Sequence, residues 1–150
     1  AGNTLYFGTG GSSSSSSTIY RQGDTGTAIH QIKRRMAVEN MFAGTVDATF
    51  DAELTYAVKV FQASEDIRVD GLVGPATWSL LFPIVRKQTG QQEGAKAVQA
   101  LLNLNGYSVG TPDGLFGTGS ENKLKQFQTA NGLTSDGICG AATWAKLCEV

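Results

Sequence analysis

Residues 70–81 read DGLVGPATWSLL, and residues 136–147 read DGICGAATWAKL, the same pattern 66 positions later. The segment KVFQ at 59–62 returns as KQFQ at 125–128, and GTVDATF at 44–50 returns as GTPDGLF at 110–116. The offset is 66 in every case, so the two halves align without a gap. A repeat of this length is the size of a whole small domain, and the sequence therefore predicts two copies of one domain.

Residues that are apolar in at least one copy recur at helical intervals of three and four positions in three segments of each copy. In the first copy these residues are Ile29, Ile32 and Met36; Leu54, Val58 and Phe61; and Trp78 and Leu81. The equivalent residues of the second copy are Ala95, Val98 and Leu102; Ser120, Leu124 and Phe127; and Trp144 and Leu147. Turns rich in glycine and aspartate separate the segments, and no alternating pattern of strands persists. The fold class predicted is all-α, with two tandem three-helix bundles.

The chain divides into three parts on this reading. Residues 1–22 include six consecutive serines flanked by glycines, a composition typical of a flexible linker, or they are the tail of a preceding domain. Residues 23–84 form the first repeat and residues 88–150 form the second. The whole chain resembles a piece of a longer protein. The two tryptophans, Trp78 and Trp144, are expected to be buried against the phenylalanine of their own copy, Phe61 or Phe127.

Charge and cysteine usage exclude several classes of function. The net charge is −1 and neither half is strongly basic, so nucleic acid is not an expected partner. No apolar stretch is long enough for a membrane span, and no membrane partner is expected. Cys139 and Cys148 would lie at opposite ends of one helix, farther apart than the roughly 7 Å between Cα atoms that a disulfide allows. Both are predicted to be buried free thiols.

The motifs of the second copy resemble a known family. They include Gly106-Tyr107, Asp113-Gly114-Leu115-Phe116-Gly117, Phe127-Gln128 and Gly132-Leu133, followed by the DGxxGxxTWxxL ending. This combination resembles the three-helix peptidoglycan-binding domain of bacterial and phage cell-wall hydrolases. The resemblance implies a non-catalytic module that binds peptidoglycan, through its glycan strand or its stem peptide. It also implies a covalently linked catalytic domain upstream, and a location outside the cell at the wall, or in a phage lysin.

The sequence contains no set of residues typical of an enzyme active site. The chain has one histidine, His30, which cannot by itself supply a zinc site. Asp47, Asp70, Asp113 and Asp136 each stand at a turn, where an aspartate side chain accepts hydrogen bonds from nearby backbone N–H groups. No cofactor and no metal are expected. The alternative function is a structural or regulatory module that keeps the fold but binds protein, as a propeptide-like cover or an assembly component.

The candidate ligand residues cluster around the glycine-rich turn of the second copy. They are Asn103, Asn105, Tyr107, Asp113, Gln128 and Asn131. Polar and aromatic groups on a rigid scaffold suit a ligand with sugar and peptide parts. Gln128 and its counterpart Gln62 either touch ligand or hold a loop backbone.

The first copy departs from the family pattern at this turn. It has Asn40-Met41 in place of Gly-Tyr, and Ala48 and Asp51 in place of two further glycines. Loss of glycine at turns with positive φ predicts a reshaped loop. We therefore expect the second copy to carry most of the binding.

Overall fold

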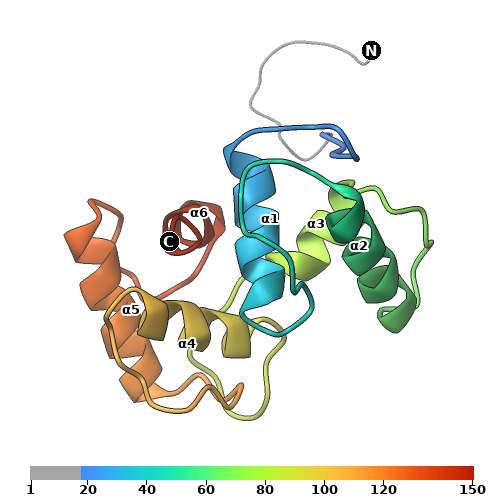
Figure 1. The fold of residues 1–150 in the computed structure, drawn as a ribbon. Helices are drawn as coiled ribbons and strands as arrows, with labels where there is room; N and C mark the ends of the chain where they lie inside the picture. Colours follow the sequence, from blue (N-terminus) through green and yellow to red (C-terminus); the bar gives the residue numbers. More distant parts are fainter. Residues whose placement is uncertain (1–17) are drawn as a thin grey trace.

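The computed structural model describes residues 18–150, so residues 1–17 of the predicted linker lie outside the described residues. The described part forms six helices and no strand, arranged as two bundles of three (Figure 1). The first bundle holds α1 (Thr27–Ala37), α2 (Ala52–Ser64) and α3 (Pro75–Leu81). The second holds α4 (Ala95–Leu104), α5 (Thr118–Ala130) and α6 (Ala141–Leu147). The predicted all-α fold with two tandem bundles is confirmed.

The repeat is visible in the helix bounds themselves. Helices α5 and α6 begin and end 66 residues after α2 and α3. Pro75 opens α3 directly after Gly74, a position where its missing N–H costs nothing. Asp51 caps α2 by accepting a hydrogen bond from the backbone N–H of Leu54 at 3.0 Å. No helix within residues 18–150 is long and apolar enough to cross a bilayer.

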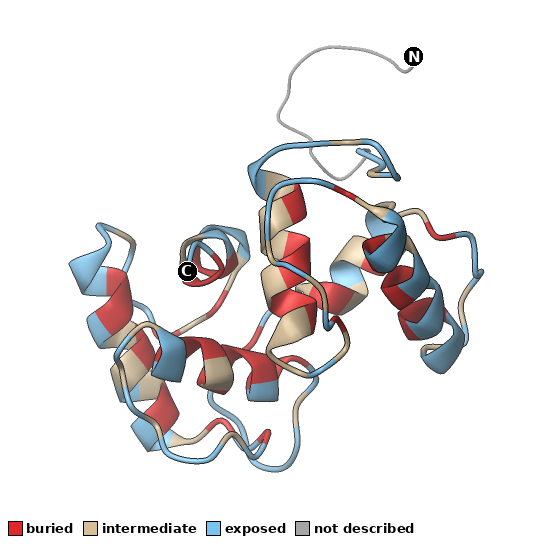
Figure 2. Ribbon diagram, viewed as in Figure 1, coloured by how far each residue is buried: buried red, intermediate tan, exposed pale blue. Residues whose placement is uncertain are grey.

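Each bundle buries its own hydrophobic core, because the predicted stripes turn inward in both (Figure 2). The core of the first bundle includes Ile29, Ile32, Met36, Leu54, Val58, Phe61 and Leu81. The core of the second includes Ala95, Val98, Leu102, Leu124, Phe127, Trp144 and Leu147. A bundle of this size is marginally stable, so each depends on these few large side chains.

Short backbone bridges close each repeat at equivalent places. Thr25 pairs with Thr49 in the first copy, and Gln91 pairs with Leu115 in the second. A further bridge joins Tyr20 to Val73, with N–H···O distances of 2.9 and 2.8 Å. The structure thus adds Tyr20 to the packing of the first repeat.

A row of aromatic rings connects the two bundles. Trp78 lies 5.7 Å from Tyr20 and 4.5 Å from Phe82, measured between ring centroids, and Phe82 lies 5.4 Å from Trp144. Trp144 is fully buried as predicted, but Trp78 is only half-buried. Both indoles pack on Phe82, which follows α3 and fills the space between the bundles. Trp144 shares the core of the second bundle with Phe127, as expected, but the ring pairs of the two indoles are formed with Phe82 and, for Trp78, with Tyr20.

Polar contacts fix the same interface. The indole Nε1 of Trp144 donates to the carbonyl oxygen of Pro83 at 2.7 Å. Arg35 stands where the second copy has the core residue Leu101, and its guanidinium lies over the Trp144 ring at 5.6 Å from the centroid. The buried Arg35 also donates from Nε to the Leu81 carbonyl at 2.5 Å and pairs with Glu39 at 2.6 Å. Arg35 is thus paired within the first repeat by Glu39 and Leu81, and it meets the second repeat through the Trp144 ring.

The first copy reshapes part of its loop, as expected, but not all of it. Asn40 keeps the left-handed backbone of its counterpart Gly106, with φ of 62° against 91°. Asparagine tolerates this region because its short polar side chain bonds locally. Ala48 has no positive φ, whereas its counterpart Gly114 has φ of 82°, so the two loops diverge there.

Asp51 does not carry the backbone strain that was predicted for it from the loss of a glycine. Gly117, the counterpart of Asp51, has an extended backbone with φ of −102°, and Asp51 has φ of −101°. Any residue adopts that conformation, so Asp51 carries no backbone penalty. Its carboxylate instead caps α2, which Gly117 cannot do for α5.

Candidate functional site

A buried glutamine holds the Asp-Gly turn before the last helix of each repeat. In the second repeat the amide nitrogen of Gln128 lies 3.1 Å from Asp136 Oδ1, 3.0 Å from the Ile138 carbonyl oxygen and 3.2 Å from the Thr143 hydroxyl. The Gln128 carbonyl oxygen accepts the Gly137 N–H at 2.9 Å. We call this arrangement a glutamine clamp. It ties the C-terminal half of α5 to the turn that starts α6.

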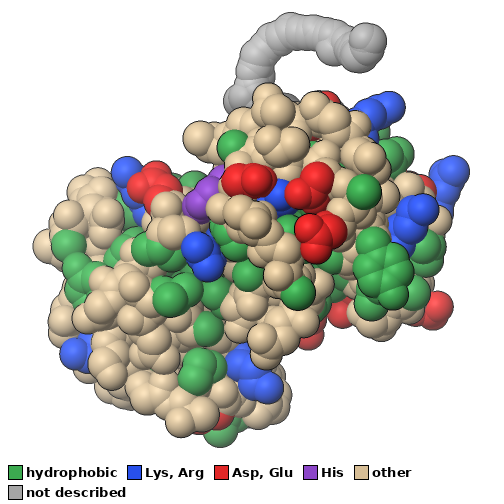
Figure 3. Space-filling view, in the orientation of Figure 1, with side chains coloured by type: hydrophobic (Ala, Val, Ile, Leu, Met, Phe, Trp, Pro, Cys, Tyr) green, Lys and Arg blue, Asp and Glu red, His purple; other side chains and the backbone are tan. Residues whose placement is uncertain are grey.

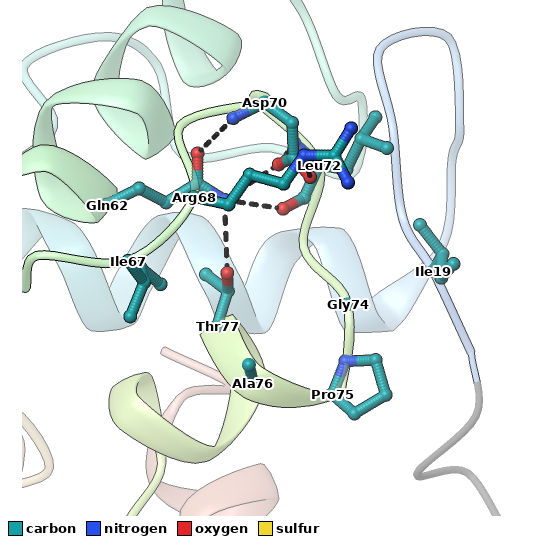
Figure 4. A pocket seen from close by; sticks show the side chains of 10 residues that line it. All are labelled: Ile19, Gln62, Ile67, Arg68, Asp70, Leu72, Gly74, Pro75, Ala76 and Thr77. Carbon is teal, nitrogen blue, oxygen red and sulfur yellow. Dashed lines mark hydrogen bonds and ion pairs between the residues drawn. The ribbon is translucent and has the colours of Figure 1, made fainter.

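The same clamp occurs in two other places. Gln62 holds the turn of Asp70, Leu72 and Thr77, as the dashed lines of Figure 4 show. On α4, Gln99 holds the turn that begins at Asp113, through Asp113 Oδ1, the Leu115 carbonyl and the Ser120 hydroxyl. In both cases the glutamine carbonyl oxygen accepts the N–H of the aspartate and of the glycine that follows it.

A lysine takes the fourth clamp position. Lys33 corresponds to Gln99, and its Nζ lies 2.6 Å from Asp47 Oδ1 and 3.0 Å from Asp51 Oδ2. Lys33 is fully buried, so its charge needs these two carboxylates. Burial lowers the pKa of Lys33, but the hydrogen bonds to Asp47 and Asp51 outweigh it and raise that pKa above its ordinary value. The first repeat thus replaces an amide network with an ionic one.

The turn aspartates are held as carboxylates. The N–H of Leu115, with the Gln99 amide, lowers the pKa of Asp113. The N–H of Leu72 lowers the pKa of Asp70, and the N–H of Ile138 lowers the pKa of Asp136. A carboxyl with a lowered pKa is a poor general acid at neutral pH. These aspartates therefore serve the turns, in agreement with the interpretation from sequence.

The loop between α4 and α5 forms the polar surface predicted from sequence. The exposed Asn103 donates to the Gly110 carbonyl at 2.8 Å and accepts the Val109 N–H at 2.8 Å, so it holds the loop to α4. Tyr107 is half-buried, and its ring meets Phe127 edge-on at 5.6 Å between centroids. Asp113 is exposed, and its Oδ1 accepts the Leu115 N–H at 2.9 Å. We call Asn103, Tyr107 and Asp113 the loop surface.

The other three candidates make contacts that stabilise the fold. Asn105 is half-buried, and its amide donates to the carbonyl oxygens of Leu101 at 2.7 Å and Leu147 at 3.1 Å. Asn131 ends α5 and donates to the Phe127 carbonyl at 2.9 Å. Gln128 is 1% exposed, and its amide is occupied by its clamp. Of the two roles open to Gln128, the structure places it in the one that holds the loop backbone.

The first repeat has a hollow beside its own clamp. It has a volume of about 270 Å³ and is lined by the apolar side chains of Ile19, Ile67, Leu72 and Pro75 (Figure 4). Arg68 lies at its edge, with its Nε 4.0 Å from Asp70 Oδ2. The sequence interpretation missed this hollow, which Ile19, a residue that precedes the repeat, closes on one side.

Sequence reasoning also missed the clamp on α4 and its lysine replacement. A signal was present, since Gln99 precedes Asp113 by 14 residues and Lys33 precedes Asp47 by the same number. Likewise, Gln128 precedes Asp136 by eight residues, as Gln62 precedes Asp70.

The residues that could carry reactive chemistry are few and separate. Cys139 and Cys148 are buried free thiols, as predicted. Burial raises the pKa of Cys148 to about 12 and that of Cys139 well above its ordinary value. Both thiols therefore stay protonated and unreactive at neutral pH. Within residues 18–150, no three side chains of His, Cys, Asp or Glu gather as metal ligands would.

Comparisons with known proteins agree with this scaffold. The family model described as "Putative peptidoglycan binding domain" matches residues 25–81 and again residues 91–147. An N-acetylmuramoyl-L-alanine amidase, CwlL of Bacillus licheniformis, is 28% identical over 91% of this chain. Another N-acetylmuramoyl-L-alanine amidase, CwlM of Mycobacterium tuberculosis, is 37% identical over 65% of this chain. The chain spans 47% of the length of the first relative and 27% of the second.

Among solved structures, the N-terminal domain of SleB is 27% identical, with a TM-score of 0.42. The match covers 44% of this chain and 90% of the SleB domain. The two family matches together span most of the described chain, and they coincide with the two bundles. The chain belongs to the peptidoglycan-binding domain family, of which it holds two tandem copies.

Proposed function

We propose that this chain is the wall-binding part of a longer protein, and that its second repeat meets peptidoglycan through the loop surface. The observation that carries the proposal is the way this surface is held. Asn103 fixes the loop to α4, and the Gln99 clamp fixes Asp113, so the Tyr107 ring and the Asp113 carboxylate are presented on a rigid support. Groups that are ordered before binding lose little entropy on binding.

The chemistry of the loop surface suits both parts of the ligand. An aromatic ring that is half exposed offers a face for a sugar ring or an acyl chain. The second oxygen of Asp113 makes no hydrogen bond with residues 18–150 and remains an acceptor for hydroxyl, amide or ammonium groups. Asn105 and Asn131 hold the ends of α4 and α5, and Gln128 holds the turn before α6, so these three residues serve the scaffold and not the loop surface.

The longer protein is proposed to be a cell-wall hydrolase. Two relatives are named as amidases, and the chain matches only part of each. The catalytic domain would then lie in the remaining sequence, upstream of residue 1, and the protein would act at the wall outside the cell or in a phage lysin. The residues encoded immediately upstream test this directly. A catalytic domain of a wall hydrolase is expected there, and an unrelated intracellular enzyme would contradict the proposal.

Sedimentation with purified insoluble peptidoglycan tests the loop surface. Tyr107→Leu keeps apolar packing on Phe127 but removes the ring, and is expected to weaken binding about tenfold, equivalent to about 1.4 kcal/mol. Its control is Met41→Leu, at the equivalent position of the first repeat. Asp113→Asn removes one charge and keeps the acceptor oxygen of the clamp, and Asp136→Asn is its matched control.

The outcomes separate two errors. If the wild-type chain binds and all four variants bind equally well, the loop surface is not the site, although the wall-binding function stands. If the wild-type chain does not bind, the proposed function is wrong. Thermal unfolding of each variant shows whether a loss of binding comes from a loss of fold.

A further inference from the structure

A cleft of about 400 Å³ lies between the two repeats and shares no residue with the loop surface. One wall comes from α1, with Thr27, His30 and Gln31, and the other from the end of the second repeat, with Ala145, Cys148 and Glu149. In Figure 3 the histidine, shown in purple, lies on the viewed face where α1 and α6 meet, between acidic and basic side chains. A volume of this size lies in the range of pockets that hold small ligands, about 300 to 1,000 Å³.

The α1 wall is polar although the fold does not require it to be. Thr27, His30 and Gln31 have the spacing i, i+3 and i+4, so they share one face of α1. The core of the first bundle takes Ile29 and Ile32 from another face. Among residues 18–150, no side-chain hydrogen bond joins Thr27, His30 or Gln31 to the protein. These three side chains are therefore available to a ligand.

The two walls are held in a fixed relation. The Nε of Arg34 donates across the interface to the Val150 main-chain oxygen at 2.8 Å. Trp144 is bonded to Pro83 and lies under Arg35, which joins the last helix to the first bundle. A cleft whose walls are already fixed binds without a cost for closing.

The chemistry of the cleft favours a peptide over a sugar. Hydroxyl, amide and imidazole groups each donate and accept, which matches peptide amides. The small imidazole of His30 is the one ring among the lining residues, and no tryptophan, tyrosine or phenylalanine offers the broad face on which sugars stack. Glu149, with a side chain 65% exposed, carries a negative charge into the cleft, and its Oε2 lies 3.7 Å from Lys146 Nζ. Lys146 and Arg34, which lies on the adjacent turn of α1 outside the lining, add positive charges nearby. Charges of both signs suit a ligand that carries an ammonium group and carboxylates.

We propose that this cleft between the repeats binds the stem peptide of peptidoglycan, a short peptide with free carboxylates and a free ammonium group. The assignment rests on the proposed function, since it names the part of the wall that a second site takes. It also gives the tandem arrangement a purpose, because neither repeat forms the cleft alone. The loop surface and the cleft would then contact the same polymer at two places, which raises the overall affinity.

The test is titration of the intact chain with the synthetic tripeptide L-Ala-γ-D-Glu-L-Lys, followed by nuclear magnetic resonance. A tetramer of N-acetylglucosamine serves as the glycan probe. The peptide is expected to shift the His30 ring signals, and the glycan probe is expected to leave them unchanged. His30→Ala should weaken peptide binding about tenfold. Its matched control is Lys96→Ala, because Lys96 is the exposed equivalent of His30 on α4, outside the cleft.

A second variant fills the cleft without removing a polar group. Ala145 is exposed on α6, so Ala145→Phe should block the peptide and leave the fold intact. The absence of any peptide-induced shift in the wild-type chain would overturn the proposal, as would equal binding by wild-type, His30→Ala and Ala145→Phe chains. A response of His30 to the glycan probe alone would assign the cleft to sugar instead. Sedimentation of the wild-type chain with insoluble peptidoglycan, run in parallel, reports on the proposed function independently.

Discussion

Replacing Gln128 by alanine is the sharpest test of the glutamine clamp. The change removes three donor contacts and one acceptor contact, and it leaves the Gly137 N–H and the Ile138 carbonyl without their partner. A buried backbone group left unsatisfied costs about 1–3 kcal/mol, so two such groups predict a loss of about 2–6 kcal/mol. We expect about 3 kcal/mol, because Asp136 is exposed and water can reach part of the turn.

A loss of this size is large for a small bundle. It corresponds to a fall in melting temperature of roughly 12–24 °C, since each kcal/mol shifts a domain of this size by about 4–8 °C. The assay is thermal and urea unfolding followed by circular dichroism. The matched control is Gln126→Ala, an exposed glutamine on the same helix, which is expected to change stability by less than about 0.5 kcal/mol. If the two variants unfold alike, the clamp does not stabilise the turn.

Three further outcomes follow from the same contacts. Lys33→Met leaves Asp47 and Asp51 without their cation and should destabilise the first repeat. In the wild-type chain the pKa of both aspartates is lowered, so the stability that they add is full above the ordinary pKa of 3.8 and is lost as the pH falls below it. Acid unfolding of the wild-type and variant chains measures this difference. Trp144→Ala should cost about 3–5 kcal/mol and Trp78→Ala clearly less, because only the first indole is fully buried; equal losses in urea unfolding would contradict this. Cys148, with a pKa of about 12, should resist a thiol reagent at pH 8 until the chain is unfolded, and rapid labelling of the folded chain would show that the thiol is accessible.

The architecture was predictable because it rests on repeated local signals. The stripe of Ile29, Ile32 and Met36 and the DGxxGxxTW ending recur at one offset, and such recurrence is preserved only where the fold needs it. Helix bounds followed from caps such as Pro75 and from turn glycines. These features depend on residues near one another in the chain.

Features that depend on distant contacts were missed. Nothing near Phe82 in sequence indicates that it packs on Trp144, 62 residues later, and so the half exposure of Trp78 was not foreseen. The role of Arg35 likewise depends on a ring in the other repeat. Among the site candidates, Asn105 shows most clearly how a distant contact changes the role of a residue. A polar residue beside a glycine indicates a surface position in a sequence, yet the Asn105 amide donates to carbonyl oxygens of both α4 and α6.

Peptidoglycan binding by the intact chain is the central claim, and co-sedimentation with purified insoluble peptidoglycan measures it most directly. The account predicts saturable enrichment of the chain in the peptidoglycan pellet, with none in parallel pellets of cellulose or chitin. Prior digestion of the peptidoglycan with a muramidase should remove the enrichment. A chain that stays in the supernatant, or that sediments equally with cellulose, would contradict the claim.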